Sequence, residues 1–459
     1  MDKLIPSVTS IRKHQLNNRA KGYWELLLLI ILASLLTQPY LLGSYGIIIW
    51  ALLGFISYNK AEYSIFYLVL SQILPDISGI PGNLAQWAII IWFLYRVISR
   101  RKIHFEILKP IALFIMPLLI WLSISAIANN ELPFYFMELI KGAVFIYITY
   151  DAVQDRDVDF VEIGAYIILA CLFAGITFWT GERASLNESV GFLGSNRGFI
   201  RIEGLRGNAN VVMVFLSFAL VGIIHRWIQS QFTGFKVFWG SFGSLLISTI
   251  LCIPPLISTQ SRTVYFLLAI MLLIIIFLEI PHVKKIDKFV SVVVEIVIFL
   301  AVVIGALNLF LPSWSLRIQS LVRYQSEESD LFSGRSYVWL PGLQIVMNHP
   351  VFGTNFSEFT EMTGGFTTSH NTIIDSGIMA GIPGMVLTAI YFISPLFIIR
   401  KNIKWRGFRL FLVLYITGLI ISMAIAFQGI KIMYILWALL YSMELYRGKG
   451  EKCESRIIK

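Results

Sequence analysis

The sequence predicts an all-α fold: a polytopic membrane helical bundle of about 12–14 transmembrane helices, with one long extracytoplasmic loop that carries short helices. The 459-residue chain is 57% hydrophobic and only 14% charged, whereas soluble domains are about a quarter charged. Its apolar runs are long and continuous, unlike the short alternating segments of a membrane β-barrel. Its lysines and arginines collect in alternate loops, as they do when they mark one side of a membrane.

The individual spans follow from length. A membrane-spanning helix needs about 20 mostly apolar residues, or fewer when flanking side chains reach the interface. About 14 runs come near that length, at 24–38, 40–58, 62–75, 84–99, 110–128, 134–150, 160–180, 208–224, 237–257, 263–280, 288–311, 372–399, 410–426 and 432–446. The first and third runs are short, which sets the lower bound of the expected number.

Basic residues predict the orientation. They concentrate in five stretches of the chain, at 3–21, 96–102, 284–288, 400–409 and 447–459. With about 14 spans, all five fall on one side of the membrane, so both termini are expected in the cytoplasm. Most of the net charge of +10 belongs to this bias, which favours anionic lipid headgroups and requires no nucleic acid.

The same topology divides the chain into five segments. They are a cytoplasmic N-terminal segment (1–23), transmembrane helices 1–11 (24–311), an extracytoplasmic catalytic loop (312–370), transmembrane helices 12–14 (371–446) and a cytoplasmic tail (447–459). Within the long loop, the stretch GRSYVWLPGLQIVMNHP predicts an amphipathic helix that Ser333 caps. Val338, Leu343, Ile345 and Val346 are expected to supply its apolar contacts, and such a helix suits a membrane surface.

The outer face is expected to hold an unusual set of basic residues. Eight of the nine are arginine: Arg183, Arg197, Arg201, Arg206, Arg262, Arg317, Arg323 and Arg335, with Lys431 the exception. Positive charge on this side opposes the orientation rule. The planar arginine side chain binds phosphate through two parallel hydrogen bonds, which lysine cannot do. The set therefore indicates phosphate recognition, although pairing with loop glutamates explains any one member equally well.

His370 is the main candidate for chemistry. It stands in TTSHNTIIDSGIMAGIPG, at the outer end of the twelfth expected span, and imidazole is a suitable base for a sugar hydroxyl. The alternative is a structural helix start, capped by Ser369 or Asn371. The glycines that follow (Gly377, Gly381 and Gly384) predict a small-residue face for close helix packing.

Other polar features are less specific. Arg262 opens the tenth expected span, where it either has a function or extends to the interface. Glu138 and Lys141 are expected to form a structural pair within the sixth span. The chain has no P-loop, no dinucleotide fingerprint, no zinc spacing and no Asp-x-Asp pair, so no cofactor and no metal are expected.

Several motifs jointly resemble those of O-antigen ligases and O-antigen polymerases. His370-Asn371, followed after nine residues by Gly381-Ile-Pro-Gly384, looks like the signature of that superfamily. Gly334-Arg335-Ser-Tyr-Val-Trp339, Asn348-His349-Pro350-Val-Phe-Gly353, Ser261-Arg262-Thr263 and the segment 204–210 resemble its other motifs, in the family's order.

The resemblance implies a metal-independent, inverting glycosyltransferase of the bacterial inner or plasma membrane that uses an undecaprenyl-diphosphate-linked glycan. His370 takes the role of base, and Arg262 and Arg335 hold the diphosphate, with Arg317 a competitor of Arg335. Arg206 and Arg201 are expected at the donor entrance, and Asn371 is a further candidate for substrate binding.

The acceptor stays open. Polymerisation of the repeat units of an O-antigen, capsule or exopolysaccharide is favoured over ligation to a lipid or protein, since nothing in the chain indicates a lipid A core partner. The rivals are a flippase or transporter and a peptidoglycan polymerase. Peptidoglycan polymerases of this kind rely on an acidic catalytic residue, and neither Asp76 nor Asp330 stands in a context typical of them. Expected partners are the lipid-linked glycan and membrane lipids. A chain-length regulator or another polysaccharide-assembly protein is a further candidate.

Overall fold

A computed structural model of the chain describes residues 25–36, 45–74, 83–100, 102–130, 134–154, 158–180, 209–233, 242–258, 262–282, 290–298, 301, 335–398, 406–423 and 431–457. Over these residues the chain is helical and contains no strand, which confirms the predicted all-α class. Arg201, Arg206 and Arg317, which are expected on the extracytoplasmic side, lie outside the described residues.

The helices follow the apolar runs of the sequence. In chain order they are Glu25–Leu36, α3 (Tyr45–Ser57), α4 (Ala61–Leu70), α5 (Leu84–Ser99), α6 (Leu108–Phe114), α7 (Met116–Asn129), α8 (Phe134–Val153), α9 (Phe160–Thr180), α10 (Ala209–Thr233), α11 (Phe242–Ser258), α12 (Arg262–Glu279), η1 (Ile280–His282), α15 (Arg335–Asn348), α16 (Phe356–Met362), α17 (Thr372–Ile393), η2 (Ser394–Ile398), α19 (Arg406–Ser422) and α20 (Ile432–Ile457).

The agreement with the predicted runs varies along the chain. α5 and α9 begin and end where the runs 84–99 and 160–180 predict. The predicted run 110–128 is instead two helices, α6 and α7, bent by 44° at a one-residue break. α10 continues beyond its predicted end to Thr233.

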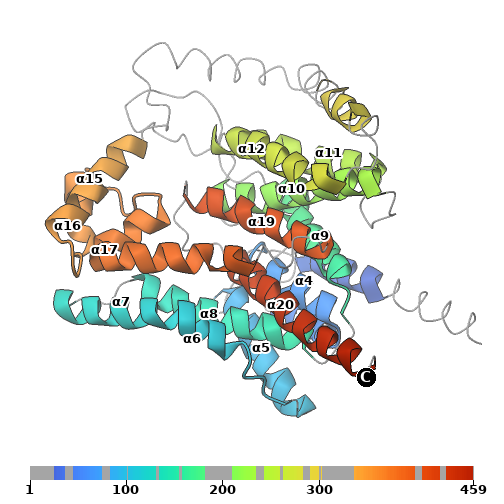
Figure 1. Ribbon diagram of the computed structural model, residues 1–459, viewed down its shortest axis with the longest axis horizontal. Coiled ribbons are helices and arrows are strands. Elements are labelled where there is room, and N and C mark those ends of the chain that lie inside the picture. Colours follow the sequence, from blue (N-terminus) through green and yellow to red (C-terminus); the bar gives the residue numbers. More distant parts are fainter. Residues whose placement is uncertain are drawn as a thin grey trace, which may run out of the picture.

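The main core lies where α9 packs between α4 and α10, with α19 and α20 beside them (Figure 1). Trp50, Trp227 and Trp437 are among its largest fully buried side chains. α4 is only 10 residues long and nine of its side chains are buried, so neighbouring helices enclose it on every side. At about 1.5 Å per residue, α4 is also too short to cross the hydrocarbon core of a bilayer.

The outer surface of the bundle is apolar. Large aliphatic and aromatic side chains are widely exposed, for example Ile127 at 79%, Phe277 at 76% and Ile98 at 71%. Two described helical segments, Met213–Gln231 and Thr372–Ile398, are long and apolar enough to cross a membrane, and α6 with α7 makes a third if the bent pair is one span. The other described apolar helices are shorter, and the expected number of spans stays a prediction.

α15 and α16 lie together beside α17 at one end of the molecule, drawn in orange (Figure 1). They share a small core with α17, separate from the main core, made of Val338, Ile345, Val346, Phe359, Ile374 and Ile378. The predicted helix is therefore present as α15, but it is not amphipathic, because apolar side chains lie on its exposed side as well as on its buried side. Ser333, its predicted cap, lies outside the described residues.

Leu343 does not lie on the buried face of α15. Its side chain is 40% exposed, whereas that of Ile345 is fully buried. At 3.6 residues per turn, two positions separated by two residues point about 200° apart, so they cannot share a face. Leu343 lies instead with exposed Leu340 and Met347 on the opposite side of the helix.

Candidate active site at the start of α17

The first turn of α17 is capped by Asn371. Its backbone is extended, and its side-chain oxygen accepts hydrogen bonds from the backbone N–H groups of Ile373 (3.0 Å) and Ile374 (3.3 Å). These are two of the N–H groups that a helix start leaves without an intrahelical partner. The cap was predicted to be Ser369 or Asn371, and the structure assigns it to Asn371.

The loop before the helix is held by a second side chain. The buried carboxylate of Asp375 accepts a hydrogen bond of 2.7 Å from the backbone N–H of Ser369. The Ser369 hydroxyl, also buried, donates to the backbone carbonyl of Asn371 at 3.1 Å. Asp375 therefore holds Ser369 from the first turn of α17, and Ser369 in turn bonds Asn371, so the two residues that flank His370 are anchored.

His370 stands between these two anchored residues in a left-handed conformation, with φ of +58°. This region is uncommon for residues other than glycine and costs about 1 kcal/mol. Its ring is half-buried, with Nδ1 3.4 Å from the Thr368 hydroxyl and the Phe366 ring edge-on at 6.3 Å. Because Asn371 supplies the cap, helix capping does not account for His370.

The start of α17 is also attached to the end of α19. The Asn371 side-chain amide donates to the carbonyl of Met423 at 3.5 Å, and the Thr372 hydroxyl donates to the carbonyl of Ser422 at 3.3 Å. The last carbonyls of a helix lack intrahelical partners, so the two helix ends satisfy each other. Asn371 is only 4% exposed and uses both ends of its amide in these contacts; its predicted role in substrate binding stays a prediction.

α17 is broken in its middle at Ala380 and Gly381. Gly381 has φ of +66° and ψ of −166°, a conformation essentially restricted to glycine. The chain after α15 crosses at this point: the N–H of Thr354 donates to the carbonyl of Ile378 (2.6 Å), and the N–H of Ile382 donates to the carbonyl of Pro350 (2.8 Å). The backbone groups freed by the break are thus paired, as a membrane environment requires.

Side chains and glycines complete this crossing. The Trp121 indole of α7 donates to the carbonyl of Ala380 at 2.8 Å. A Cβ atom on Gly381 would lie 2.4 Å from the carbonyl oxygen of Val351, and one on Gly353 would lie 2.4 Å from that of Ile378. The two motifs, 348–353 and 381–384, are therefore two sides of one close backbone contact.

The prediction of a small-residue packing face holds for Gly377, where a Cβ atom would approach Val346 of α15 to 2.8 Å. At Gly381 the physical reason is different, because the residue serves a backbone break as well as a close approach.

The predicted pair of Glu138 and Lys141 is confirmed, with 2.7 Å between the carboxylate and the amine.

The predicted site residues are described to different degrees. His370 and Asn371 lie together at the start of α17. Arg262 and Arg335 are the first residues of α12 and α15, and their side chains lie outside the described part of the structure. Their roles, like those of Arg201, Arg206 and Arg317, stay predictions.

Sequence reasoning missed two residues that shape the site, Asp375 and Trp121. A carboxylate in the first turn of an otherwise apolar helix was the available signal for Asp375. No sequence signal pointed to Trp121, because its partner is a backbone carbonyl 259 residues away. Over the described residues, no three His, Cys, Asp or Glu side chains gather where they could hold a metal ion.

Comparison with known proteins gives one match. Residues 246–389 match the family model of the O-antigen ligase, a segment that contains His370, Asn371, Arg262, Arg335 and Arg317. No curated protein matches the chain. The match confirms the resemblance found in the motifs, and with the apolar helices it indicates an integral membrane protein with activity broadly of this glycosyltransferase type. Residues 246–389 are thus similar to the O-antigen ligase family.

Proposed function

We propose that the protein is an inverting, metal-independent glycosyltransferase that polymerises repeat units of a surface polysaccharide from an undecaprenyl-diphosphate-linked donor. The observation that carries this proposal is the position of His370. It is a left-handed residue between two anchored neighbours, at the start of a capped helix and within the family-matched segment. Strained backbone that is held by its surroundings is typical of functional sites.

In the proposed reaction, the His370 imidazole removes the proton from an acceptor hydroxyl. The hydroxyl oxygen forms a bond to the anomeric carbon from the face opposite the diphosphate. The bond from that carbon to the diphosphate oxygen breaks, and the lipid diphosphate leaves with the electron pair. Inversion at the anomeric carbon follows from this single displacement.

Arginine side chains supply the second part of the proposal. Negative charge grows on the departing diphosphate, and cationic donors placed there in advance stabilise it in the transition state. We assign this role to Arg262 and Arg335, with Arg317 as the competitor of Arg335, and we place Arg206 and Arg201 at the donor entrance. These assignments rest on the family motifs and on the arginine content of the expected outer face.

The experiment is a transfer assay with purified protein and a defined undecaprenyl-diphosphate oligosaccharide. A polymerase produces a ladder of longer lipid-linked glycans from the donor alone. A ligase produces nothing until a lipid or protein acceptor is added. The configuration of the new glycosidic bond, determined by NMR spectroscopy, shows whether the anomeric centre is inverted.

His370→Ala should lower the transfer rate by about 10²–10⁴-fold, because general-base catalysis is typically worth that much. His349→Ala is the matched control. It removes a histidine of the same family-matched segment, one whose exposed ring lies 3.2 Å from the Glu358 carboxylate. A His370→Ala variant with wild-type product would refute the assignment of the base.

Arg262→Lys and Arg335→Lys keep the charge and lose the planar side chain. Bidentate recognition of the diphosphate predicts that each variant loses most of its activity and binds the donor more weakly. Binding of a short-chain lipid diphosphate, measured at two salt concentrations, separates recognition from screened attraction. Wild-type affinity in both lysine variants would indicate that the diphosphate binds at Arg206 and Arg317 instead.

A further inference from the structure

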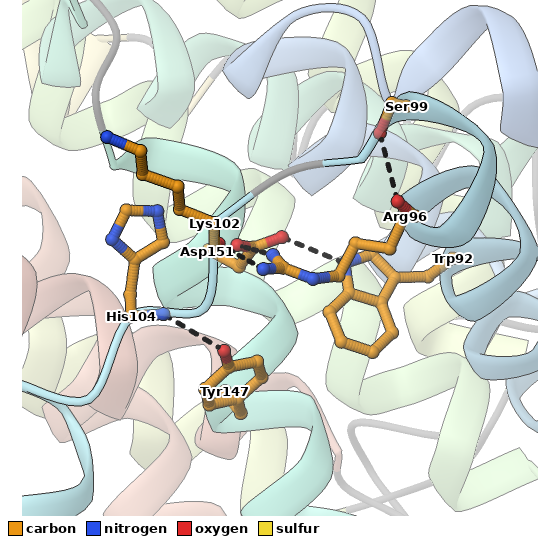
Figure 2. Close-up of polar contacts among 7 residues, drawn as sticks. All are labelled: Trp92, Arg96, Ser99, Lys102, His104, Tyr147 and Asp151. Atoms are coloured by element: carbon orange, nitrogen blue, oxygen red, sulfur yellow. Dashed lines mark hydrogen bonds and ion pairs between the residues drawn. The ribbon is translucent and has the colours of Figure 1, made fainter.

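A second polar cluster lies where α5 ends, far from α17 in the sequence. Arg96 and Asp151, from the ends of α5 and α8, form an ion pair that is only 8% and 4% exposed. Arg96 also donates to the backbone carbonyl of Lys102, and its guanidinium lies over the Trp92 ring (Figure 2). Because Arg96 is committed to these partners, its charge is neutralised within the protein.

Aromatic side chains complete the cluster. The Trp92 indole donates to Asp151 at 3.1 Å, and the Tyr147 hydroxyl accepts from the backbone N–H of His104 at 3.3 Å (Figure 2). The Trp92 and Tyr147 rings meet edge to face, with centroids 5.8 Å apart. Tryptophan and tyrosine with one polar end anchored are typical of the boundary between membrane and water.

Three residues of this cluster, Trp92, Arg96 and Tyr147, line an open groove of about 570 Å³. Its other lining residues are Phe93, Val97, Arg100 and Ile103. Phe93 and Val97 are each 60% exposed, and Ile103 is 61% exposed. The groove thus has an exposed apolar floor and an arginine at the end of an apolar helix.

Arg100 is placed unusually. It ends α5 in the left-handed conformation, with φ of +50° and ψ of +38°, a position that glycine or asparagine fills at lower cost. Its side chain is exposed, and no other described residue forms an ion pair with it. The left-handed backbone therefore does not by itself favour an arginine here.

We propose that this groove binds an anionic phospholipid of the cytoplasmic leaflet, with its phosphate on the Arg100 guanidinium and an acyl chain along Phe93, Val97 and Ile103. An exposed arginine that forms no ion pair with the described residues, above an apolar floor, is complementary to a headgroup with a negative charge and a hydrocarbon tail. The basic stretch at 96–102 lies on the expected cytoplasmic side, where anionic lipids attract such residues. This site is independent of the glycosyltransferase proposal.

The test uses the full chain purified in detergent and native mass spectrometry, which counts retained lipids. The probes are phosphatidylglycerol and phosphatidylcholine with identical acyl chains. The wild type should retain phosphatidylglycerol under activation that removes phosphatidylcholine. Arg100→Gly should weaken retention of phosphatidylglycerol about five- to tenfold, since one basic contact near a membrane surface is worth about that much.

Three comparisons isolate the cause. Arg100→Gly relaxes the left-handed backbone, so its midpoint of thermal unfolding should not fall, which excludes misfolding as the reason for lost lipid. Arg100→Lys keeps the charge without the planar side chain and should bind with intermediate strength. Lys109→Gln removes an exposed charge that does not line the groove and should retain lipid like the wild type.

Four outcomes overturn the proposal. Equal retention of the two lipids would remove the charge preference. Unchanged retention in Arg100→Gly would place the lipid elsewhere. Displacement of the lipid by soluble glycerol 3-phosphate would show that the groove recognises a phosphate without its chains. A dimer that Phe93→Ser abolishes would show that a second copy of the chain covers the groove.

Discussion

The start of α17 and the end of α5 both carry a left-handed residue that is neither glycine nor asparagine, His370 and Arg100. The two regions differ in which part of the structure hydrogen bonds hold in place. At α17 the backbone is held on both sides of His370 by Asp375 and by the cap. At the α5 end, the bonds of the neighbouring Arg96 and Trp92 hold the wall of a groove instead.

The difference corresponds to two kinds of chemistry. A general base works only when its ring atom is aimed at the reacting proton, and small misplacements are costly. A lipid phosphate is mobile, and a long arginine side chain follows it as long as the groove keeps its shape. A fixed backbone therefore suits the proposed catalytic site, and a fixed wall suits the proposed lipid site.

The largest expected effect concerns the sides of the membrane on which the two regions lie. On a Cys453→Ser background, a thiol reagent that does not cross the membrane should label Ser326→Cys in intact cells and miss Ser455→Cys. Cys171 and Cys252 are buried and should stay unlabelled. Labelling of Ser455→Cys in intact cells would show that the predicted orientation is wrong, and with it the leaflet assigned to the groove.

At the α5 end, Asp151→Asn should lower the free energy of unfolding by about 3–5 kcal/mol, because it leaves the buried Arg96 charge without its counterion. Titration with a denaturing detergent measures this loss. Glu361→Gln, which neutralises an exposed carboxylate, should change it by less than about 0.5 kcal/mol. A loss as small as that of the control would mean that the groove wall does not depend on the ion pair.

At α17, Gly381→Ala should cost about 3 kcal/mol, since the methyl group meets the carbonyl of Val351 and the backbone conformation excludes other residues. Gly364→Ala is the matched control. Gly364 also has a positive φ but nothing within 4 Å, so only about 1 kcal/mol is expected. Equal losses in the same unfolding measurement would show that the crossing with residues 350–354 is not a tight contact.

The smallest expected effect sharpens the role of Asp375. Asp375→Ala removes the acceptor of the Ser369 N–H and should lower kcat about tenfold with little change in KM, because a misaligned base costs about 1.4 kcal/mol of barrier. Asp375→Asn keeps an acceptor oxygen and should restore most of the rate. An asparagine variant as slow as the alanine variant would mean that the carboxylate charge acts directly on the reaction.

Hydropathy located most helices because the apolar composition of a segment is a local property of the chain. It did not distinguish an apolar helix surrounded by lipid from one surrounded by protein. α4 illustrates this limit: it was predicted as a candidate span, yet nine of its ten side chains are buried among other helices. The bend between α6 and α7 and the break at Gly381 were also invisible, since both interrupt continuous apolar runs.

By itself, the sequence determined the helical class, the apolar character and the motifs around His370, because composition and short spacings require no partner. Only the tertiary structure decided that Asn371 is the cap, that Asp375 anchors Ser369, and that Gly353 and Gly381 face each other. These contacts join hydrogen-bonding groups and backbone segments that meet only after folding. The local sequence pattern therefore does not predict them. The groove at Arg100 has the same origin, because its aromatic and charged wall comes from helices that are distant in the chain.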